Sequence, residues 1–128
     1  MNKIKIFGLL VNDYDGAIQF YTQKLGFEVV EDVSFGEDRW ITVSFPGDHG
    51  VALSLQLAKT AEDKALVGKQ AGSYPLLGLE TLDCYADYNR MKEIGVKFQG
   101  EPEGGPWGTG VLLDDLYGNK IFMNQEPG

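Results

Sequence analysis

Few side chains in this sequence have the types and the spacing that support catalysis. The single histidine, His49, lies in a predicted turn over residues 46–50. The single cysteine, Cys84, has neither an internal disulfide partner nor a zinc-type spacing, so we expect a reduced structural thiol. The glycines of residues 104–110 precede no helix and no lysine or threonine at phosphate-loop spacing, which disfavours phosphate chemistry. These glycines are better explained as permitting close backbone turns.

The remaining candidates suit the binding of a small molecule. Arg39 and Trp40 could form an anion hook and a stacking wall, or else a solvated charge beside a packed aromatic ring. Trp107 follows a Gly-Gly-Pro segment and could cover a site as a lid, or could anchor an otherwise loose loop. Tyr74, beside a proline, suits either a pocket or a turn. The sequence leaves each of these alternatives open.

Glu80 is the acid that comes closest to a catalytic candidate. If its side chain faced a partly dry interior, it could act as a general base. It could equally lie exposed at the rim of a site or pair with Lys120. Without a partner acid, a histidine or a metal ion, a lone carboxylate gives only a thin argument for catalysis.

The charge balance excludes some classes of partner. The net charge is −8 at pH 7, with no block of lysines and arginines, which argues against nucleic acid and anionic membranes as partners. The acidity is compatible with a cationic ligand, although it could serve solubility alone. No signal peptide or membrane-spanning run is recognisable, so we expect a cytoplasmic protein. A length of 128 residues fits one compact domain.

Two similar series of elements follow each other along the chain. The first has a helix from Asp13 to Leu25, with Asp13 as N-cap and Gly26 after its end, among strands over residues 4–11, 27–30, 39–45 and 51–56. The second has a helix from Asp83 to Ile94 among strands over residues 76–81, 96–98, 111–113 and 120–125, with a loop over residues 101–106. A connector over residues 58–73 joins them and contains a short helix around residues 61–67.

This repetition predicts an α+β fold of two βαβββ modules, over about residues 3–57 and 74–126 of a single domain. A helix covers only one face of each sheet. We therefore expect the two sheets to curl together into a cup around a shared interior, which is the candidate site.

The motifs on these elements resemble those of the vicinal-oxygen-chelate superfamily, which contains glyoxalase I, bleomycin-resistance proteins and extradiol dioxygenases. The segments that carry the resemblance are Val11-Asn12-Asp13, Ala17, Phe20-Tyr21, Leu25-Gly26-Phe27, Leu79-Glu80-Thr81, Asp83-Cys84 and Asp115-Leu116-Tyr117-Gly118-Asn119. The match covers nearly the whole chain in the right order. Leu116, where the family prefers proline, and Leu82, where it prefers an acid, are departures that leave the fold expectation intact.

The resemblance implies four positions at which metal-dependent members hold a divalent ion. Here these positions carry Ile6, Ser54, Leu76 and Phe122. A divalent catalytic site needs imidazole, carboxylate or thiolate ligands, and three of these side chains have no lone pair. We therefore expect a member without the metal ligands and without a cofactor.

Strand alternation supports this alignment independently, because a slip of one residue would move every side chain to the other face. One parity is almost wholly apolar and suits the core beneath the helices: Phe7, Leu9, Val11, Val51, Leu53, Leu55, Leu77, Leu79, Ile121 and Met123. The other parity is mixed and suits a ligand cup: Ile6, Gly8, Leu10, Trp40, Thr42, Ser44, Ala52, Ser54, Gln56, Leu76, Gly78, Glu80, Lys120, Phe122 and Asn124. Phe122 is expected on the floor of the cup.

These observations favour a metal-independent protein that binds a small organic ligand, cationic or aromatic, in a homodimer similar to bleomycin-resistance proteins. The ligand-binding residues would be Arg39, Trp40, Ser54, Gln56, Leu76, Glu80, Trp107 and Phe122. The alternatives are a lyase, isomerase or dioxygenase-type enzyme of the same superfamily, and a structural or regulatory paralogue without activity.

Overall fold

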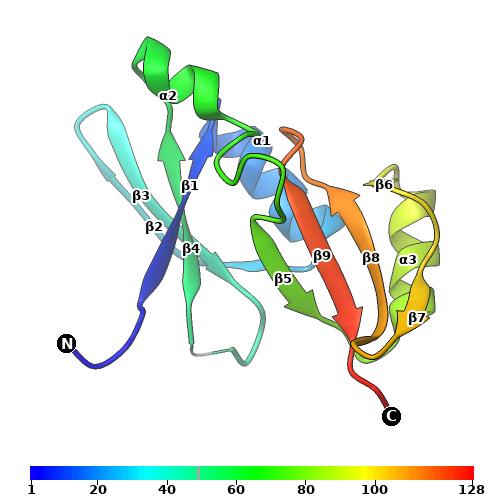
Figure 1. Cartoon of the computed structure of the whole chain (residues 1–128). Helices are drawn as coiled ribbons and strands as arrows, with labels where there is room; N and C mark the ends of the chain where they lie inside the picture. Colours follow the sequence, from blue (N-terminus) through cyan, green and yellow to red (C-terminus); the bar gives the residue numbers. More distant parts are fainter. Residues whose placement is uncertain (49) are drawn as a thin grey trace. The chain divides into compact units, whose positions relative to one another are not determined.

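A computed structural model describes residues 1–48 and 50–128, so His49 lies outside the described residues (Figure 1). The chain forms two compact units, Met1–Val67 and Gly68–Gly128, and each is described by itself. Among the described residues, no helix is long and apolar enough to cross a bilayer.

The first unit is a four-stranded sheet in the order β1-β4-β3-β2, with β1 and β4 parallel and the other neighbours antiparallel. Its elements are β1 (Ile6–Val11), α1 (Tyr14–Gln19), the π-helical turn η1 (Phe20–Lys24), β2 (Glu28–Phe35), β3 (Asp38–Ser44), β4 (Ala52–Leu57) and α2 (Ala61–Leu66). The last of these confirms the short helix expected in the connector.

The first helix begins where the sequence predicts. The side chain of Asp13 accepts a hydrogen bond from the backbone N–H of Gly16 at 2.6 Å, and Gly26 follows the helix with φ of +87°. The helix is not α-helical throughout, because its second half is η1. Within it, the Thr22 hydroxyl donates to the carbonyl of Ile18 at 2.7 Å, a side-chain bond that competes with the regular α-helical pattern.

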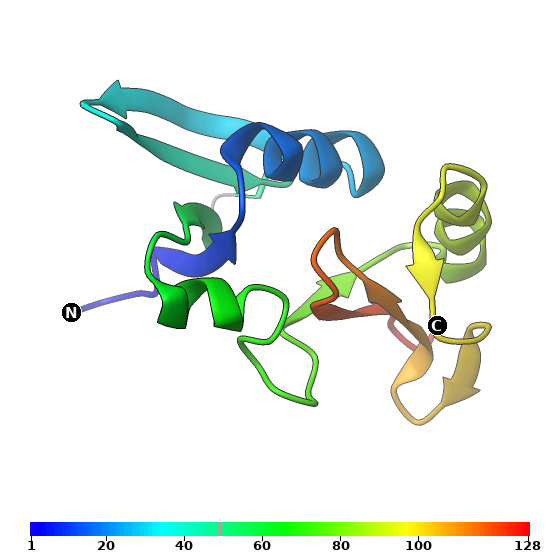
Figure 2. The same cartoon turned by 90° about the horizontal axis from the view of Figure 1, so that it is seen from above.

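The strand β2 is longer than predicted and forms a hairpin with β3 that closes at residues 36 and 37. Glu31, Asp32 and Ser34 hid the rest of the strand, because acids and serine are poor strand formers. All eight residues of β2 are exposed, and Figure 2 shows the tip of the hairpin extending past the first turn of α1.

The second unit repeats this arrangement. Its sheet has the order β5-β9-β8-β6, with β5 and β9 parallel. Its elements are β5 (Leu77–Glu80), α3 (Cys84–Glu93), β6 (Lys97–Phe98), β7 (Glu103–Gly105), β8 (Gly108–Asp114) and β9 (Lys120–Gln125). The predicted N-cap is confirmed, because Asp83 accepts from the N–H of Ala86 at 3.0 Å. Two βαβββ modules of an α+β fold are therefore present.

One prediction for the second unit was wrong. The segment predicted as a loop over residues 101–106 contains the strand β7, which pairs antiparallel with β8. Its glycines gave no strand signal, because the pairing depends on backbone groups rather than on side-chain propensity.

The hydrophobic cores follow the predicted parity. Leu9, Leu53 and Leu55 lie beneath α1 and η1 in the first unit, and Ile121 and Met123 lie beneath α3 in the second. The prediction was wrong for Phe7 and Val51, which are exposed: Phe7 is the second residue of β1, and Val51 precedes β4. Leu77 and Leu79 are half-buried on the short strand β5.

The family's closing motif is a hydrogen-bonded turn between β8 and β9. The buried Asp115 carboxylate accepts from the backbone N–H groups of Tyr117 and Asn119 at 2.9 and 2.8 Å, and from the Asn119 side chain at 2.9 Å. Charge-assisted bonds of this kind are about twice as strong as neutral ones. This turn fixes the register of β9 and therefore the face on which Phe122 lies.

Candidate binding site

A pocket at the β7–β8 hairpin brings together two residues that the sequence selected, Trp107 and Phe122. We call it the Trp107 pocket; its volume is about 210 Å³, and it is lined by Gln99, Glu101, Glu103, Trp107, Gly110, Val111, Leu112 and Phe122. The turn Pro106-Trp107 joins β7 to β8, which places the indole at the end of the hairpin, where it is about half exposed.

Each of the two aromatic rings of this pocket packs directly against a glycine. A Cβ atom at Gly105 would overlap the six-membered ring of Trp107. A Cβ atom at Gly110 would lie 2.5 Å from Cζ of Phe122. Because real Cβ atoms do not approach so closely, both rings need a glycine beneath them, and residues 104–110 serve aromatic packing as well as turn formation.

The floor of the pocket is a row of residues that lie opposite one another across the strands of the sheet. Phe122 lies opposite Leu112 on β8 and opposite Gly78 on β5, and the N–H of Gln99 bonds the carbonyl of Leu112 at 2.9 Å. This row lies on the face away from α3, as the alternation predicts for Phe122. A leucine and a phenylalanine side by side give the floor its apolar character.

The rim of the Trp107 pocket carries negative charge. Glu101 and Glu103 are both exposed, and the lining contains no lysine or arginine. The nearby acid Asp114 does not add to this charge, because it forms an ion pair with Lys120 at 2.7 Å. Two aromatic rings beside two carboxylates are suited to a planar ligand with a positive charge.

In the first unit, the residues that lie opposite one another at the same place in the sheet are mostly polar. Gly8, Ser54, Thr42 and Glu31 lie opposite one another across β1, β4, β3 and β2. Thr42 and Ser54 are each 1% exposed, and the Thr42 hydroxyl donates to the carboxylate of Glu31 at 3.1 Å. Among the described residues, the Ser54 hydroxyl has no hydrogen-bond partner, so it can still bond one polar group.

The other selected residues lie in different surroundings. Trp40 is half-buried opposite Val33, Gln56 is exposed with its amide over Gly8, and Glu80 is exposed opposite Asn124. Leu76 precedes β5, and its N–H donates to the carbonyl of Lys120 at 2.7 Å. Tyr74 is 75% exposed.

Arg39 is already paired with two acids of its own unit. Its guanidinium bonds Asp32 at 2.7 and 3.2 Å and Asp15 at 2.8 Å. The hydrogen bonds to Asp32 and then to Asp15 raise the pKa of Arg39 above its ordinary value, and the bond from Arg39 lowers the pKa of Asp32. With both carboxylates in place, little positive charge is left to attract an anionic ligand.

Cys84 is fully buried on α3. Desolvation is the main cause that raises the pKa of its thiol, and the negative charges of Asp87 and Asp83 raise it further. A raised thiol pKa reduces the thiolate fraction, and the thiolate is the nucleophile. The surroundings therefore suit the structural thiol that the sequence suggests.

At the four positions that the resemblance implies as ligands, the residues present do not fit a divalent metal ion. Ile6, Leu76 and Phe122 offer no lone pair, and Ser54 is a neutral hydroxyl. Over the described part of the chain, no group of three or more histidine, cysteine, aspartate and glutamate side chains gathers in a way that could hold an ion.

Sequence reasoning missed Glu31, Glu101, Glu103 and Leu112. Glu101 and Glu103 stood in a segment interpreted as a loop, and Glu31 stood beyond the predicted end of its strand. Aligning the two modules would have found Leu112. It lies opposite Phe122 in the second sheet, just as Thr42 lies opposite Ser54 in the first.

The fold and these rows define a vicinal-oxygen-chelate protein. Residues 3–123 match the Glyoxalase/Bleomycin resistance protein/Dioxygenase superfamily, so the chain belongs to it. An uncharacterized protein of Shewanella frigidimarina is 46% identical over 113 residues, which cover 87% of this chain and 84% of that protein.

Two solved structures are similar to the chain in both fold and sequence. UcmS2 is 32% identical with a TM-score of 0.85, covering 97% of this chain and 98% of that one. TnmS3, an antibiotic-binding protein from Streptomyces sp. CB03234, is 30% identical with a TM-score of 0.80, covering 98% of this chain and 97% of that one.

The seat of Phe122 can be tested by adding a methyl group beneath it. Gly110→Ala should displace the ring and lower the free energy of unfolding by about 1–3 kcal/mol, the usual cost of overpacking. Gly78→Ala is the matched control, because no atom lies within 4 Å of its added Cβ, and it should be near neutral. Urea denaturation measures both. Equal effects of the two changes, or no relief of the Gly110→Ala cost by Phe122→Ala, would contradict the proposed seat.

Proposed function

We propose that this protein binds a small organic molecule without a metal ion and that the Trp107 pocket receives a planar, positively charged part of it. The observation that supports the proposal most is that two aromatic rings, each packed against a glycine, line the same pocket as two exposed carboxylates. The relation to TnmS3, which binds an antibiotic, supports small-molecule binding as the class of function.

The size of the pocket limits what it can receive. Pockets that enclose a drug-sized ligand measure roughly 300–1,000 Å³, whereas the Trp107 pocket measures about 210 Å³. It therefore suits one ring system, and a larger ligand would extend beyond it. The half-exposed indole of Trp107 can stack on such a ring, and Glu101 and Glu103 can attract its positive charge.

Two probes of similar size and opposite charge test this proposal. 1-Naphthylmethylammonium should bind more tightly than naphthalene-1-sulfonate in isothermal titration calorimetry, because the carboxylates attract the first and repel the second. The indole N–H signal of Trp107 in NMR spectra should move with the cation, and Trp40→Phe identifies that signal. Failure of both probes to bind, or equal affinity for both, would count against a cation-accepting pocket.

Variants of the lining separate charge from stacking. Glu101→Gln with Glu103→Gln should weaken cation binding about fivefold, the scale expected for two exposed charges. Phe122→Ala should weaken it about threefold through loss of ring contact. Glu93→Gln, an exposed change on α3, should leave the affinity unchanged.

Metal independence is tested by restoring one family ligand. Phe122→Glu places a carboxylate in an apolar row while Ile6, Ser54 and Leu76 stay inert, so the variant should be less stable and should gain no metal affinity. Thermal unfolding with and without zinc, nickel or manganese measures both effects. A tightly bound ion that raises the Tm of this variant, or stoichiometric metal in the purified parent protein, would reveal a metal site that the proposal denies.

We further infer a homodimer, supported by the exposed apolar side chains of the β2–β3 hairpin. Val33 and Phe35 are 57% and 58% exposed, and Val33 lies opposite Trp40. Exposed apolar surface of this kind typically marks an interaction site, and a symmetric dimer would cover it with one self-complementary contact.

Light scattering after size exclusion should give twice the mass of one chain. Val33→Asp with Phe35→Asp should shift the protein to monomer, because each charge would be buried in the dimer contact. Leu66→Asp, on the exposed side of α2, is the control and should stay dimeric. A parent protein that stays monomeric across a wide concentration range would rule the dimer out.

A further inference from the structure

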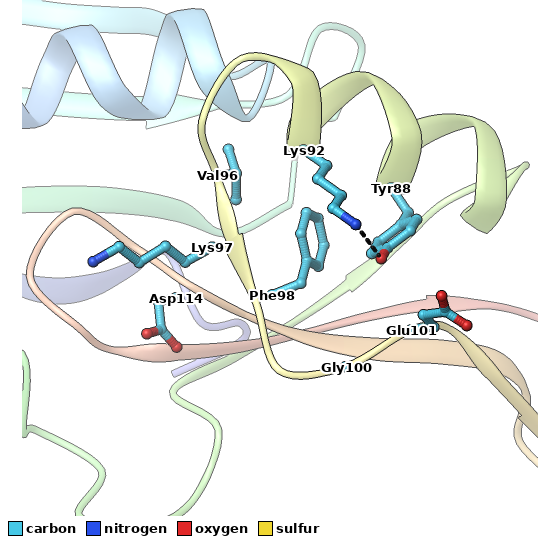
Figure 3. Close-up of a pocket in the computed structure, with 8 residues that line it drawn as sticks. All are labelled: Tyr88, Lys92, Val96, Lys97, Phe98, Gly100, Glu101 and Asp114. Atoms are coloured by element: carbon cyan, nitrogen blue, oxygen red, sulfur yellow. Dashed lines mark hydrogen bonds between the residues drawn. The ribbon is translucent and has the colours of Figure 1, made fainter.

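A second and larger pocket lies in the Gly68–Gly128 unit, between α3 and the edge strand β6 (Figure 3). We call it the α3–β6 pocket; its volume is about 580 Å³, within the range of small-molecule sites. Tyr88 and Phe98 form an aromatic wall, with ring centroids 4.7 Å apart in an edge-to-face arrangement. Val96 is buried beside them and extends the apolar surface.

Two hydrogen-bond donors meet at this wall. The ammonium group of Lys92 donates to the hydroxyl of Tyr88, the bond dashed in Figure 3, at 3.3 Å. It lies 5.4 Å from the centre of the Tyr88 ring. Because that bond occupies the Tyr88 oxygen as acceptor, the hydroxyl proton must point elsewhere, and the described residues provide no acceptor for it. The ammonium group keeps two further N–H bonds. The hydroxyl and the ammonium can therefore bond one oxyanion together.

The charges around the pocket favour an anion. Lys92 and Lys97 form no ion pair with any described residue. Figure 3 shows the Lys97 side chain pointing away from Tyr88, so Lys92 is the cation beside the aromatic wall. Asp114 is neutralised by Lys120 and also accepts from Gln99 at 3.1 Å. Glu101 is the one acid in the lining without such a partner. Both Glu101 and Lys92 are exposed, so water screens both charges, and the preference for an anion rests on the two donors that meet at Tyr88.

We propose that the α3–β6 pocket is a second ligand site, which binds the carboxylate of an aromatic organic acid through Lys92 and Tyr88 and packs its ring against Phe98. The proposal is independent of cation binding in the Trp107 pocket. The two pockets share only Glu101, and their aromatic residues are different.

The test is a titration of ¹⁵N-labelled protein with sodium benzoate at constant ionic strength. The backbone amide signals of Lys92, Phe98 and Gly100 should move saturably. Benzyl alcohol, which has the ring without the charge, should bind at least tenfold more weakly. A response that does not saturate, or one confined to signals of the Trp107 pocket, would overturn the proposal.

Variants then assign the donors. Tyr88→Phe removes only the hydroxyl and should weaken benzoate binding about tenfold, the effect of losing one hydrogen bond to a charged group. Lys92→Gln should weaken it further, while Lys64→Gln on α2 should have no effect. Glu101→Gln should leave benzoate binding intact or strengthen it. Unchanged affinity in both Tyr88→Phe and Lys92→Gln, with native spectra, would exclude this site.

Discussion

The parallel pairing of the first and last strand in each unit is the constraint on which the other features depend. β1 pairs with β4 and β5 with β9, and a shift of one residue in either pair would exchange the two faces of the strand. In the observed register, Leu55 and Met123 lie beneath the helices, while Ser54 and Phe122 lie on the opposite face. The N-caps at Asp13 and Asp83 and the Asp115 turn hold the elements that fix this register.

The two modules have the same strand arrangement, but the sheet faces away from their helices carry different residues. Ser54 and Phe122 occupy matching places next to Gly8 and Gly78, yet one row is polar and the other apolar. Both residues lie on the face away from the helices, so the residue type there can differ between the modules while the helix-covered core stays the same. One scaffold can therefore present different chemistry on this face, which suits a superfamily with many activities.

Ion pairing decides which of the many charges are available to ligands. Arg39 is engaged by Asp15 and Asp32, and Lys120 is engaged by Asp114. The acids at the rim of the Trp107 pocket and the lysines of the α3–β6 pocket have no such partners among the described residues. The net charge of −8 therefore does not by itself indicate which charge a ligand of either pocket would carry.

The sequence by itself determined the element order, the repeated module and the face on which Phe122 lies, because periodicity and capping are local properties. It did not reveal β7 or the full length of β2, because backbone pairing with a neighbour overrode weak strand propensity. Only the tertiary structure decided that Trp107 and Phe122 line one pocket, that acids pair with Arg39, and that Lys92 bonds Tyr88 beside Phe98. The first depends on the pairing of β8 with β9, and the second on the packing of α1 beside the β2–β3 hairpin, which brings Asp15 to Arg39. The Lys92–Tyr88 bond is local to α3, but the pocket beside it is formed only when β6 and β8 pack near that helix.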